Sequence, residues 1–257
     1  MSRVWLTGAS SGIGAALAAV LLEQGHHLAV SARRTHPLET LATRYQDQIL
    51  VLPGDLTDPH QVATICQQID LHWGALDLVI LNAGTCEYLE PDHFDTRLVE
   101  RLINTNLLGT CHCLEAALPL LRRGQRPHLV AVSSAVTSLA LPRAGAYGAS
   151  KAALRYLIES LRIDLAAEGI DVTLVSPGFV DTPLTRRNDF PMPMRWPVKK
   201  AATYIAERLL RSRRPMEIAF PGPFILILRL LALLPVRAQL ALGKRMARSA
   251  AQTKDAQ

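Results

Sequence analysis

A tyrosine and a lysine four positions apart could together move a proton. Tyr147 and Lys151 begin a helical pattern in Tyr147-Gly148-Ala149-Ser150-Lys151, and side chains at this spacing share one face of a helix. A free phenol, with a pKa of about 10, is a poor base at neutral pH. A nearby ammonium lowers that pKa, so the pair predicts proton transfer to or from a substrate oxygen. The same spacing also arises by chance in helices without chemical function.

A glycine cluster near the N-terminus could hold a phosphate. Thr7-Gly8-Ala9-Ser10-Ser11-Gly12-Ile13-Gly14 follows an apolar run and opens a helical pattern. Glycines there permit a sharp turn and let backbone N–H groups approach a pyrophosphate at a helix N-terminus. The spacing G-x-x-x-G-x-G differs from the common G-x-G-x-x-G fingerprint, and an ordinary strand-to-helix turn is the alternative interpretation.

Two arginines bear on which dinucleotide would bind. Ser31-Ala32-Arg33-Arg34 ends the second apolar run, where an acidic residue would favour NAD by accepting from the ribose 2′-hydroxyl. Guanidinium groups instead suit a 2′-phosphate. The sequence therefore favours NADP(H), with Arg33 as the primary contact, although NAD(H) remains open. The alternative is a solvated loop with two arginines.

Alternating short apolar runs and amphipathic stretches must position these residues. Strands are expected at Arg3–Thr7, His27–Ala32, Ile49–Leu52, Leu76–Leu81, His128–Ser133, Asp171–Val175 and Glu217–Phe220. Helices are expected at Ile13–Gln24, Pro59–Leu71, Leu98–Leu121 and Ala146–Glu168. This order predicts a parallel sheet covered by helices on both faces. Residues 182–200 contain four prolines and are expected to be an irregular insertion in a single domain.

The full set of motifs resembles the short-chain dehydrogenase/reductase family. Besides the glycine turn and the Tyr147/Lys151 pair, it includes Asp55-Leu56, Asn82-Ala83-Gly84, Asn106, Ser134 and Pro177-Gly178-Phe179-Val180-Asp181-Thr182, in the family's order from about residue 3 to 220. The resemblance implies an α/β fold of Rossmann type, with a doubly wound, seven-stranded parallel sheet. It also implies NAD(P) dependence and a homodimer or homotetramer.

The resemblance also implies residue roles. Tyr147 would exchange the proton, Lys151 would bind the nicotinamide ribose, Ser134 would orient the substrate oxygen and Asn106 would hold a water in a proton relay. The implied cofactor-binding residues are Gly8, Ser10, Ser11, Gly12, Ile13, Gly14, Arg33, Arg34, Asp55, Leu56, Asn82, Ala83, Gly84, Tyr147, Lys151, Pro177, Gly178, Val180 and Thr182. The expected function is an NADP(H)-dependent oxidoreductase. The alternatives are a non-catalytic nucleotide-binding scaffold and a membrane-tethered protein of the same fold.

The resemblance implies that the segment after the sixth expected strand closes the substrate pocket, and its apolar residues suggest a hydrophobic ketone, aldehyde or secondary alcohol as substrate. They are Phe179, Leu184, Phe190, Met192, Met194 and Trp196, which would make an adaptable lining or simply pack the lid. Cys86 follows the Asn82-Ala83-Gly84 turn and is expected to line the pocket rather than to react.

The C-terminal segment carries the positive charge. The net charge is +6, yet residues 1–210 hold 19 basic and 20 acidic residues, whereas residues 211–257 hold 9 and 2. Because the resemblance ends near residue 220, we divide the chain into a nucleotide-binding domain at 1–220 and a helical extension at 221–257. Phe224–Leu234 is apolar nearly all round but shorter than the span of about 20 residues that a bilayer needs.

The sequence does not decide what the C-terminal extension contacts. Arg237, Lys244 and Arg248 recur at helical spacing, with Val236 and Leu240 on another side. Such a segment could lie on an anionic membrane surface, pack on a second subunit or cover the pocket. No nucleic-acid-binding module accompanies the charge.

Cysteine usage and the first residues bear on compartment and metal content. Cys66, Cys86, Cys111 and Cys113 form no C-x-x-C pair, so no metal site is expected. Reduced thiols and the absence of a signal peptide at Met1 predict a cytoplasmic protein, with membrane-surface contact as an open alternative.

Overall fold

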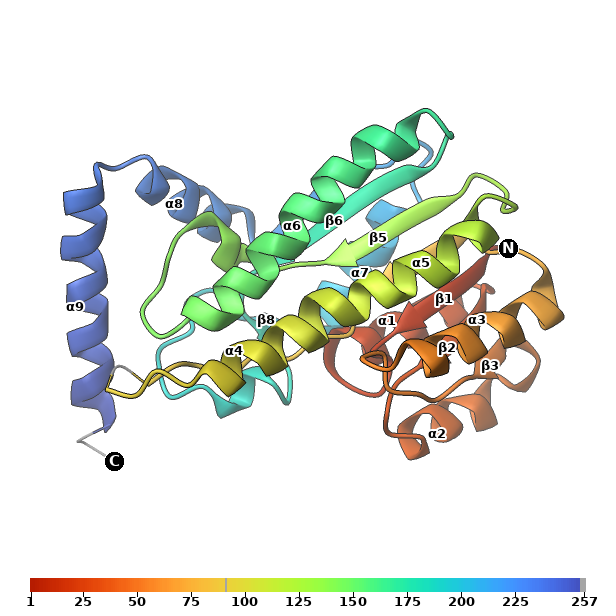
Figure 1. The fold of residues 1–257 in the computed structure, drawn as a ribbon, viewed down its shortest axis with the longest axis horizontal. Helices are drawn as coiled ribbons and strands as arrows, with labels where there is room; N and C mark the ends of the chain where they lie inside the picture. The colour runs from red at the N-terminus through yellow and green to blue at the C-terminus, as the bar shows by residue number, and fades with distance from the viewer. Residues whose placement is uncertain (91, 255–257) are drawn as a thin grey trace.

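A parallel sheet forms the centre of the molecule (Figure 1). The computed structural model describes residues 1–90 and 92–254, with residues 248–254 described through their backbone alone. Within these residues lies a seven-stranded sheet in which every neighbouring pair is parallel. Its order is β3 (Ile49–Val51), β2 (His27–Ser31), β1 (Arg3–Thr7), β4 (Leu78–Leu81), β5 (His128–Val132), β6 (Asp171–Pro177) and β9 (Glu217–Phe220). The predicted doubly wound sheet of Rossmann type is confirmed.

Helices cover both faces of this sheet, with α1 (Gly12–Glu23) and α7 (Val198–Leu209) on one face and α3 (Pro59–Trp73), α5 (Gly109–Leu121) and α6 (Gly145–Ala166) on the other. The remaining helices of the described residues are α2 (His36–Arg44), α4 (Thr96–Ile103), α8 (Gly222–Ala232) and α9 (Val236–Lys254). The short turns are η1 (Gln46–Gln48), η2 (Asn104–Leu108), η3 (Ala135–Ser138) and η4 (Thr185–Arg187), and β7 (Val180–Asp181) pairs with β8 (Trp196–Pro197) outside the main sheet. Strand order reverses between β1 and β4, so the crevice for a ligand lies at their carboxyl ends.

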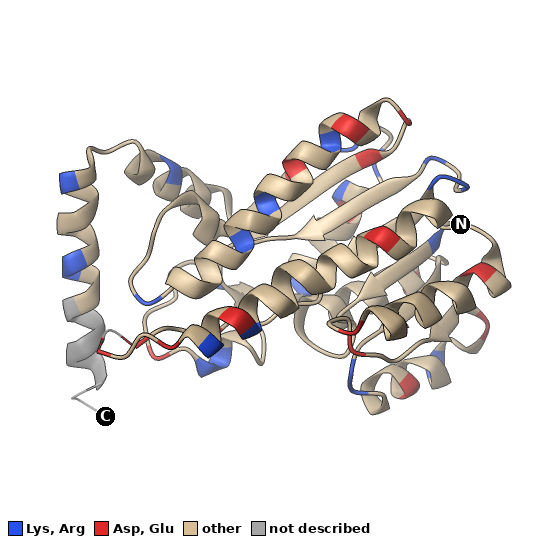
Figure 2. Ribbon diagram, viewed as in Figure 1, with Lys and Arg blue, Asp and Glu red and all other residues tan. Residues whose placement is uncertain are grey.

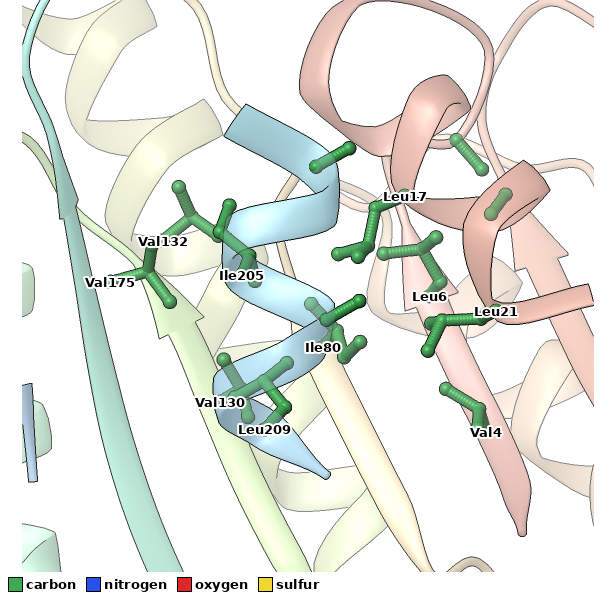
Figure 3. Close-up of a cluster of buried hydrophobic side chains, with 14 of the residues drawn as sticks. Val4, Leu6, Leu17, Leu21, Ile80, Val130, Val132, Val175, Ile205 and Leu209 are labelled. Atoms are coloured by element: carbon green, nitrogen blue, oxygen red, sulfur yellow. The ribbon is translucent and has the colours of Figure 1, made fainter. Parts of the chain in front are cut away.

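Side-chain alternation along each strand builds two cores. On β1, Leu6 packs with α1 and α7, whereas Trp5 points to the other face and packs with α3, α5 and α6. Figure 3 shows the first core, where Leu17 of α1 and Ile205 of α7 meet the strand side chains. Because both faces are buried, the strands are apolar throughout.

Residues at two helix termini have the conformation and hydrogen bonds that their types favour. Gly25 has a φ of 81° and donates its N–H to the Leu22 carbonyl at 2.9 Å after α1, a left-handed C-terminal turn that suits glycine. Asp58 Oδ1 accepts from the amide of His60 at 2.9 Å and so caps α3.

The expected helix at Leu98–Leu121 is interrupted. The structure divides it into α4, the π-helical turn η2 and α5. Apolar periodicity continues through the interruption, so the sequence pattern does not reveal it. The buried side chain of Asn106 bonds to neighbouring segments inside this wider turn.

The segment at 182–200 is irregular, as expected, up to residue 197. It contains η4 and β8, but Val198 already begins α7. Proline has no amide hydrogen, and Pro197 stands as the N-cap of α7, where that amide is not required.

Two helices, α8 and α9, follow the last strand. α8 packs against η3, and α9 then leads away from the sheet (Figure 1). The predicted extension runs to residue 257, but residues 255–257 and the side chain of Arg248 lie outside the described part. In residues 1–90 and 92–254, no helix is both long and apolar enough to cross a membrane.

Candidate active site

The glycine turn joins β1 to α1 at the carboxyl edge of the sheet. Gly8 and Gly12 have positive φ angles of 68° and 55°, a region that other residues adopt only with strain. A Cβ on Gly14 would collide with the carbonyl oxygen of Gly8 and lie 2.5 Å from Asn82 Nδ2. The glycines therefore keep the backbone bare where α1 begins.

The N-terminus of α1 is open to an anion. Ser11 is its N-cap, and the Ser11 side chain makes no capping hydrogen bond, while the half-buried Ile13 packs on the first core. First-turn amides of a helix readily bind phosphate.

Arg34 Nη2 donates to Ser10 Oγ at 3.4 Å, which places this arginine beside the turn. Arg33 is exposed just after β2.

The Asn82-Ala83-Gly84 segment ties β4 to the glycine turn. Asn82 Nδ2 donates to the carbonyl oxygens of Thr7 and Gly8 at 3.1 and 3.3 Å. The amides of Asn82 and Ala83 donate to Thr7 Oγ1 at 3.0 and 3.1 Å. These bonds hold the carboxyl ends of β1 and β4 together beside the predicted nucleotide.

Asp55 and Leu56 follow β3 at the same edge of the sheet. Asp55 Oδ1 accepts from the Thr57 amide at 3.0 Å and from Thr57 Oγ1 at 2.8 Å. Leu56 packs on the second core, and its carbonyl oxygen lies 3.1 Å from His112 Nδ1. Both residues are thus held in place from α5 and from their own turn.

Asn106 is fully buried in the π-helical turn. Its Oδ1 accepts from the Thr85 amide at 2.8 Å, and its Nδ2 donates to the Thr85 carbonyl and to Ser150 Oγ, each at 2.9 Å. A Cβ on Gly84 would lie 3.1 Å both from Asn106 Oδ1 and from Lys151 Nζ. Glycine at position 84 therefore preserves a small gap beside these two polar atoms.

Tyr147, Lys151 and Ser134 meet where α6 begins beside the end of β5. The Tyr147 side chain lies close enough to Ser134 for the two to interact, and Ser134 Oγ accepts from the Val136 amide at 3.2 Å. Lys151 Nζ donates to the Val132 carbonyl at 2.9 Å. The structure thus places Tyr147 next to Ser134, with Lys151 and Asn106 both beside Gly84.

Burial shifts both titratable partners away from their charged forms. Desolvation raises the pKa of the Tyr147 phenol above its ordinary value, and Cys86 adds to the shift, while the interaction with Ser134 opposes it. Desolvation lowers the pKa of the Lys151 ammonium to about 8. Lys151 therefore holds its proton more weakly than an exposed lysine does. The expected lowering of the phenol pKa by Lys151 stays a prediction.

The segment from Pro177 to Thr182 lies opposite the glycine turn. A Cβ on Gly12 would lie 3.3 Å from Thr182 Cγ2. Gly178 donates its amide to the Phe220 carbonyl at 2.7 Å, which holds the segment at the end of β6. Val180 is buried in β7. The predicted phosphate turn and the predicted nicotinamide segment are therefore neighbours.

Aromatic rings gather beside Tyr147. The Phe190 ring lies 5.2 Å from that of Tyr88 and 6.2 Å from that of Phe179, and Phe179 lies 5.4 Å from Phe224 of α8. Tyr88 interacts with the side chains of Cys86 and Tyr147, which both contribute to its raised pKa. Burial raises the pKa of the Cys86 thiol to about 11, so this cysteine is protonated at neutral pH and suits the lining predicted for it.

One expected lining residue faces elsewhere. The Trp196 ring stacks on Phe220 at 5.0 Å and meets Tyr204 of α7 edge-on at 5.2 Å. It packs on the first core, so its assignment to the pocket was wrong. The sequence shows an apolar residue in a proline-rich loop, but pairing of β8 with β7 decides which way the ring points.

Sequence reasoning missed Tyr88, Phe224 and Arg143. Arg143 Nη2 donates to Glu90 Oε1 at 2.7 Å, and Arg143 Nη1 donates to Asp189. Its guanidinium carbon also lies 5.8 Å from the centre of the Tyr88 ring. The one available cue was position: Tyr88 follows the turn after β4, and Arg143 precedes the Tyr147 helix.

The carboxyl edge of the sheet fits a dinucleotide. The glycine turn and the uncapped first turn of α1 lie at the predicted phosphate end, and Gly84 lies beside Lys151. Among the residues that the structure describes, no three His, Cys, Asp or Glu side chains gather where they could hold a metal ion.

Comparison with known proteins places the chain in a family. The family model described as short chain dehydrogenase matches residues 2–190. An uncharacterized oxidoreductase of Myxococcus xanthus is 35% identical over 233 residues, which cover 90% of this chain and 91% of that protein.

Solved structures of similar fold support the same family assignment. A short-chain dehydrogenase from Streptomyces avermitilis has a TM-score of 0.81 at 27% identity, covering 96% of this chain and 97% of that one. The Pseudomonas aeruginosa RhlG/NADP active-site complex has a TM-score of 0.79 at 26% identity, covering 87% and 96%. This chain belongs to the short-chain dehydrogenase/reductase family of NAD(P)-dependent oxidoreductases.

Proposed function

We propose that this enzyme transfers a hydride between NADP(H) and a hydrophobic ketone, aldehyde or secondary alcohol, with Tyr147 exchanging the proton. The observation that carries the proposal is the position of the Tyr147 side chain, which interacts with Ser134 beside a cluster of aromatic rings. A proton donor such as Tyr147, placed beside apolar side chains, suits the reduction of a carbonyl group on an apolar substrate.

Tyr147 and Ser134 act on the substrate oxygen. In reduction, the carbonyl carbon receives the hydride, and the Tyr147 O–H bond breaks as its proton passes to the carbonyl oxygen. In oxidation, the same steps run backwards, with Tyr147 accepting the hydroxyl proton. Ser134 Oγ accepts from the Val136 amide, so its own O–H is oriented by the protein and available to position the substrate oxygen.

Lys151 and Asn106 support that proton transfer. The dinucleotide supplies the hydride, while the protein supplies position and electrostatics. Lys151 has three N–H donors; one bonds to Val132, which leaves the others for ribose hydroxyls. Asn106 Oδ1 and Lys151 Nζ both lie beside Gly84, so Asn106 would hold the relay water close to the lysine.

Residues around the edge of the sheet would bind the rest of the cofactor. The pyrophosphate would lie on Gly8, Ser10, Ser11, Gly12, Ile13 and Gly14, the adenine near Asp55, Leu56, Asn82, Ala83 and Gly84, and the nicotinamide near Pro177, Gly178, Val180 and Thr182. Arg33 and Arg34 would hold the 2′-phosphate. The NADP complex of the Pseudomonas relative supports this choice of cofactor.

The proposal is tested by following NADPH and NADH oxidation with ketones and aldehydes of graded chain length. Tyr147→Phe is expected to lower turnover by about 10²–10⁴-fold while NADPH binding persists. Tyr156→Phe, an exposed tyrosine on the same helix, is the matched control and should leave turnover unchanged.

Three results would contradict parts of the proposal. Full turnover in Tyr147→Phe would remove the tyrosine from the mechanism, and NADPH binding without turnover of any carbonyl would favour the scaffold alternative. Equal use of NADPH and NADH would refute the argument from the two arginines.

We also propose a cytoplasmic homodimer or homotetramer. Tyr156 and Ile163 are exposed on one side of α6, which offers apolar surface to a second copy. Light scattering of the purified chain measures the assembly directly, and a monomer at micromolar concentration would contradict it.

A further inference from the structure

The outer face of α8 is apolar and uncovered. Its inner face is buried through Ile225 and Leu228, which pack on Ala135 and Leu139 around η3. The opposite side is exposed at Leu226, Ile227, Leu230, Leu233 and Leu234, and the exposed series continues into α9 with Val236 and Leu240. An apolar surface of this extent marks a site of contact with another molecule or with a membrane.

Positive charge surrounds this apolar surface. Residues 221–254 contain six basic and no acidic residues, and Figure 2 shows the blue positions along α9 without a red one. Arg229 is paired with Glu217 at 2.8 Å, whereas Arg237 and Lys244 are exposed. Two copies meeting through this surface would bring like charges together, which disfavours that contact.

The two helices hold a defined shape. Gln239 Nε2 donates to the Ala232 and Leu234 carbonyls at 3.0 and 2.8 Å, which secures the corner between α8 and α9. The Arg229–Glu217 pair fastens α8 to β9. A surface that is already ordered loses little conformational entropy when it binds.

We propose that the outer face of α8 and the first turns of α9 dock on an anionic phospholipid bilayer. Leucines would enter the interface while Arg237 and Lys244 meet lipid phosphates, as in amphipathic helices that lie in the membrane plane. Neither helix spans the bilayer. The inference stands apart from the proposed reaction, because it uses no residue assigned to catalysis.

Co-sedimentation of the full chain with vesicles tests the docking. The chain should pellet with vesicles of phosphatidylcholine mixed with phosphatidylglycerol, and not with phosphatidylcholine alone. The double variant Arg237→Gln/Lys244→Gln should bind about fivefold more weakly for each charge removed. The triple variant Leu226→Gln/Leu230→Gln/Leu233→Gln should lose binding.

Matched controls separate docking from general surface effects. Leu71→Gln/Met216→Gln removes exposed apolar side chains elsewhere, and Arg211→Gln/Arg213→Gln removes exposed charges before β9. Both should bind vesicles nearly as the wild type does, and circular dichroism checks that every variant folds.

Three results would overturn the proposal. They are no pelleting above the vesicle-free background, equal binding of the triple variant and the wild type, and equal binding to neutral and anionic vesicles. Light scattering without lipid shows whether a second copy of the chain covers this surface instead of a membrane. If the triple variant turns a wild-type dimer into a monomer and neither form binds vesicles, the surface is an interface between copies.

Discussion

Arg143 donates two hydrogen bonds to the carboxylate of Asp189, at 2.8 and 2.9 Å, from the loop just before the Tyr147 helix. The same guanidinium bonds to Glu90 and lies over the ring of Tyr88. One side chain thereby joins the loop after β4, the segment after β6 and the loop before α6. These are the three segments that surround the aromatic cluster.

We predict that Arg143→Lys raises KM for hydrophobic substrates about tenfold and changes kcat little. Arg143 bonds Asp189 through Nη1 and Glu90 through Nη2, and lysine, with a single nitrogen, cannot hold both carboxylates in the same way. Losing one charge-assisted bond of about 1.5 kcal/mol corresponds to that factor. Steady-state kinetics measures the split between KM and kcat. Arg123→Lys, in an exposed pair with Asp70, is the control. A wild-type KM in Arg143→Lys would count against a role in holding the pocket closed.

The buried Lys151 predicts a specific dependence of stability on pH. Its pKa falls from 10.5 to about 8 on folding, so between these values the unfolded chain binds the proton more tightly. Stability from this group therefore rises as pH increases through that window. Below about pH 8, burial of the ammonium costs roughly 3 kcal/mol.

The comparison with Lys151→Met isolates this effect. Relative to that variant, the wild type should gain roughly 3 kcal/mol of unfolding free energy between about pH 7 and pH 11. Urea unfolding at a series of pH values measures the difference. The exposed Lys199, replaced in the same way, should show a flat difference. A flat difference for Lys151→Met would mean that the ammonium is solvated.

Gly14→Ala should abolish NADPH binding and lower stability by about 1–3 kcal/mol. The new Cβ would collide with the Gly8 carbonyl and crowd Asn82, forcing the phosphate turn to move. Gly148→Ala in α6 is the control, because its Cβ would have no neighbour closer than 3.9 Å, and alanine in a helix should stabilise by about 0.5–1 kcal/mol. Thermal unfolding and NADPH fluorescence report the two effects.

Arg33→Ser/Arg34→Ser should raise KM for NADPH by about tenfold or more and leave KM for NADH within about twofold. The reason is that only the 2′-phosphate loses charge-assisted donors. Arg44→Ser, which removes an exposed arginine from the end of α2, should change neither value. A parallel rise for both cofactors would show that the arginines act through the turn itself.

Local sequence patterns predicted most of the backbone. The short apolar runs give all of the main-sheet strands within a residue or two, because a strand buried on both faces must be apolar along its length. The start of β4 was placed at Leu76, but pairing begins at Leu78, since the Leu76 amide bonds to the Leu120 carbonyl instead. The glycine turn could also be read directly, because bare backbone at a helix start leaves a glycine signature.

Contacts between distant segments were beyond such patterns. The π-helical turn at Asn106 depends on bonds to Thr85 and Ser150, and Phe224 reaches Phe179 only because α8 folds back over η3. Arg143 is an isolated arginine in a loop until Asp189 and Glu90 meet it.

The amino-acid order was therefore sufficient for the fold, the family motifs and the basic, apolar character of residues 221–254. Spatial folding was needed to show that one face of α8 supports η3 while the other stays uncovered, and that Trp196 joins the core rather than the pocket. The physical reason is the distance along the chain over which each kind of interaction acts. Periodicity and turn chemistry act over a few residues, whereas the composition of a pocket or surface depends on which remote segments close upon each other.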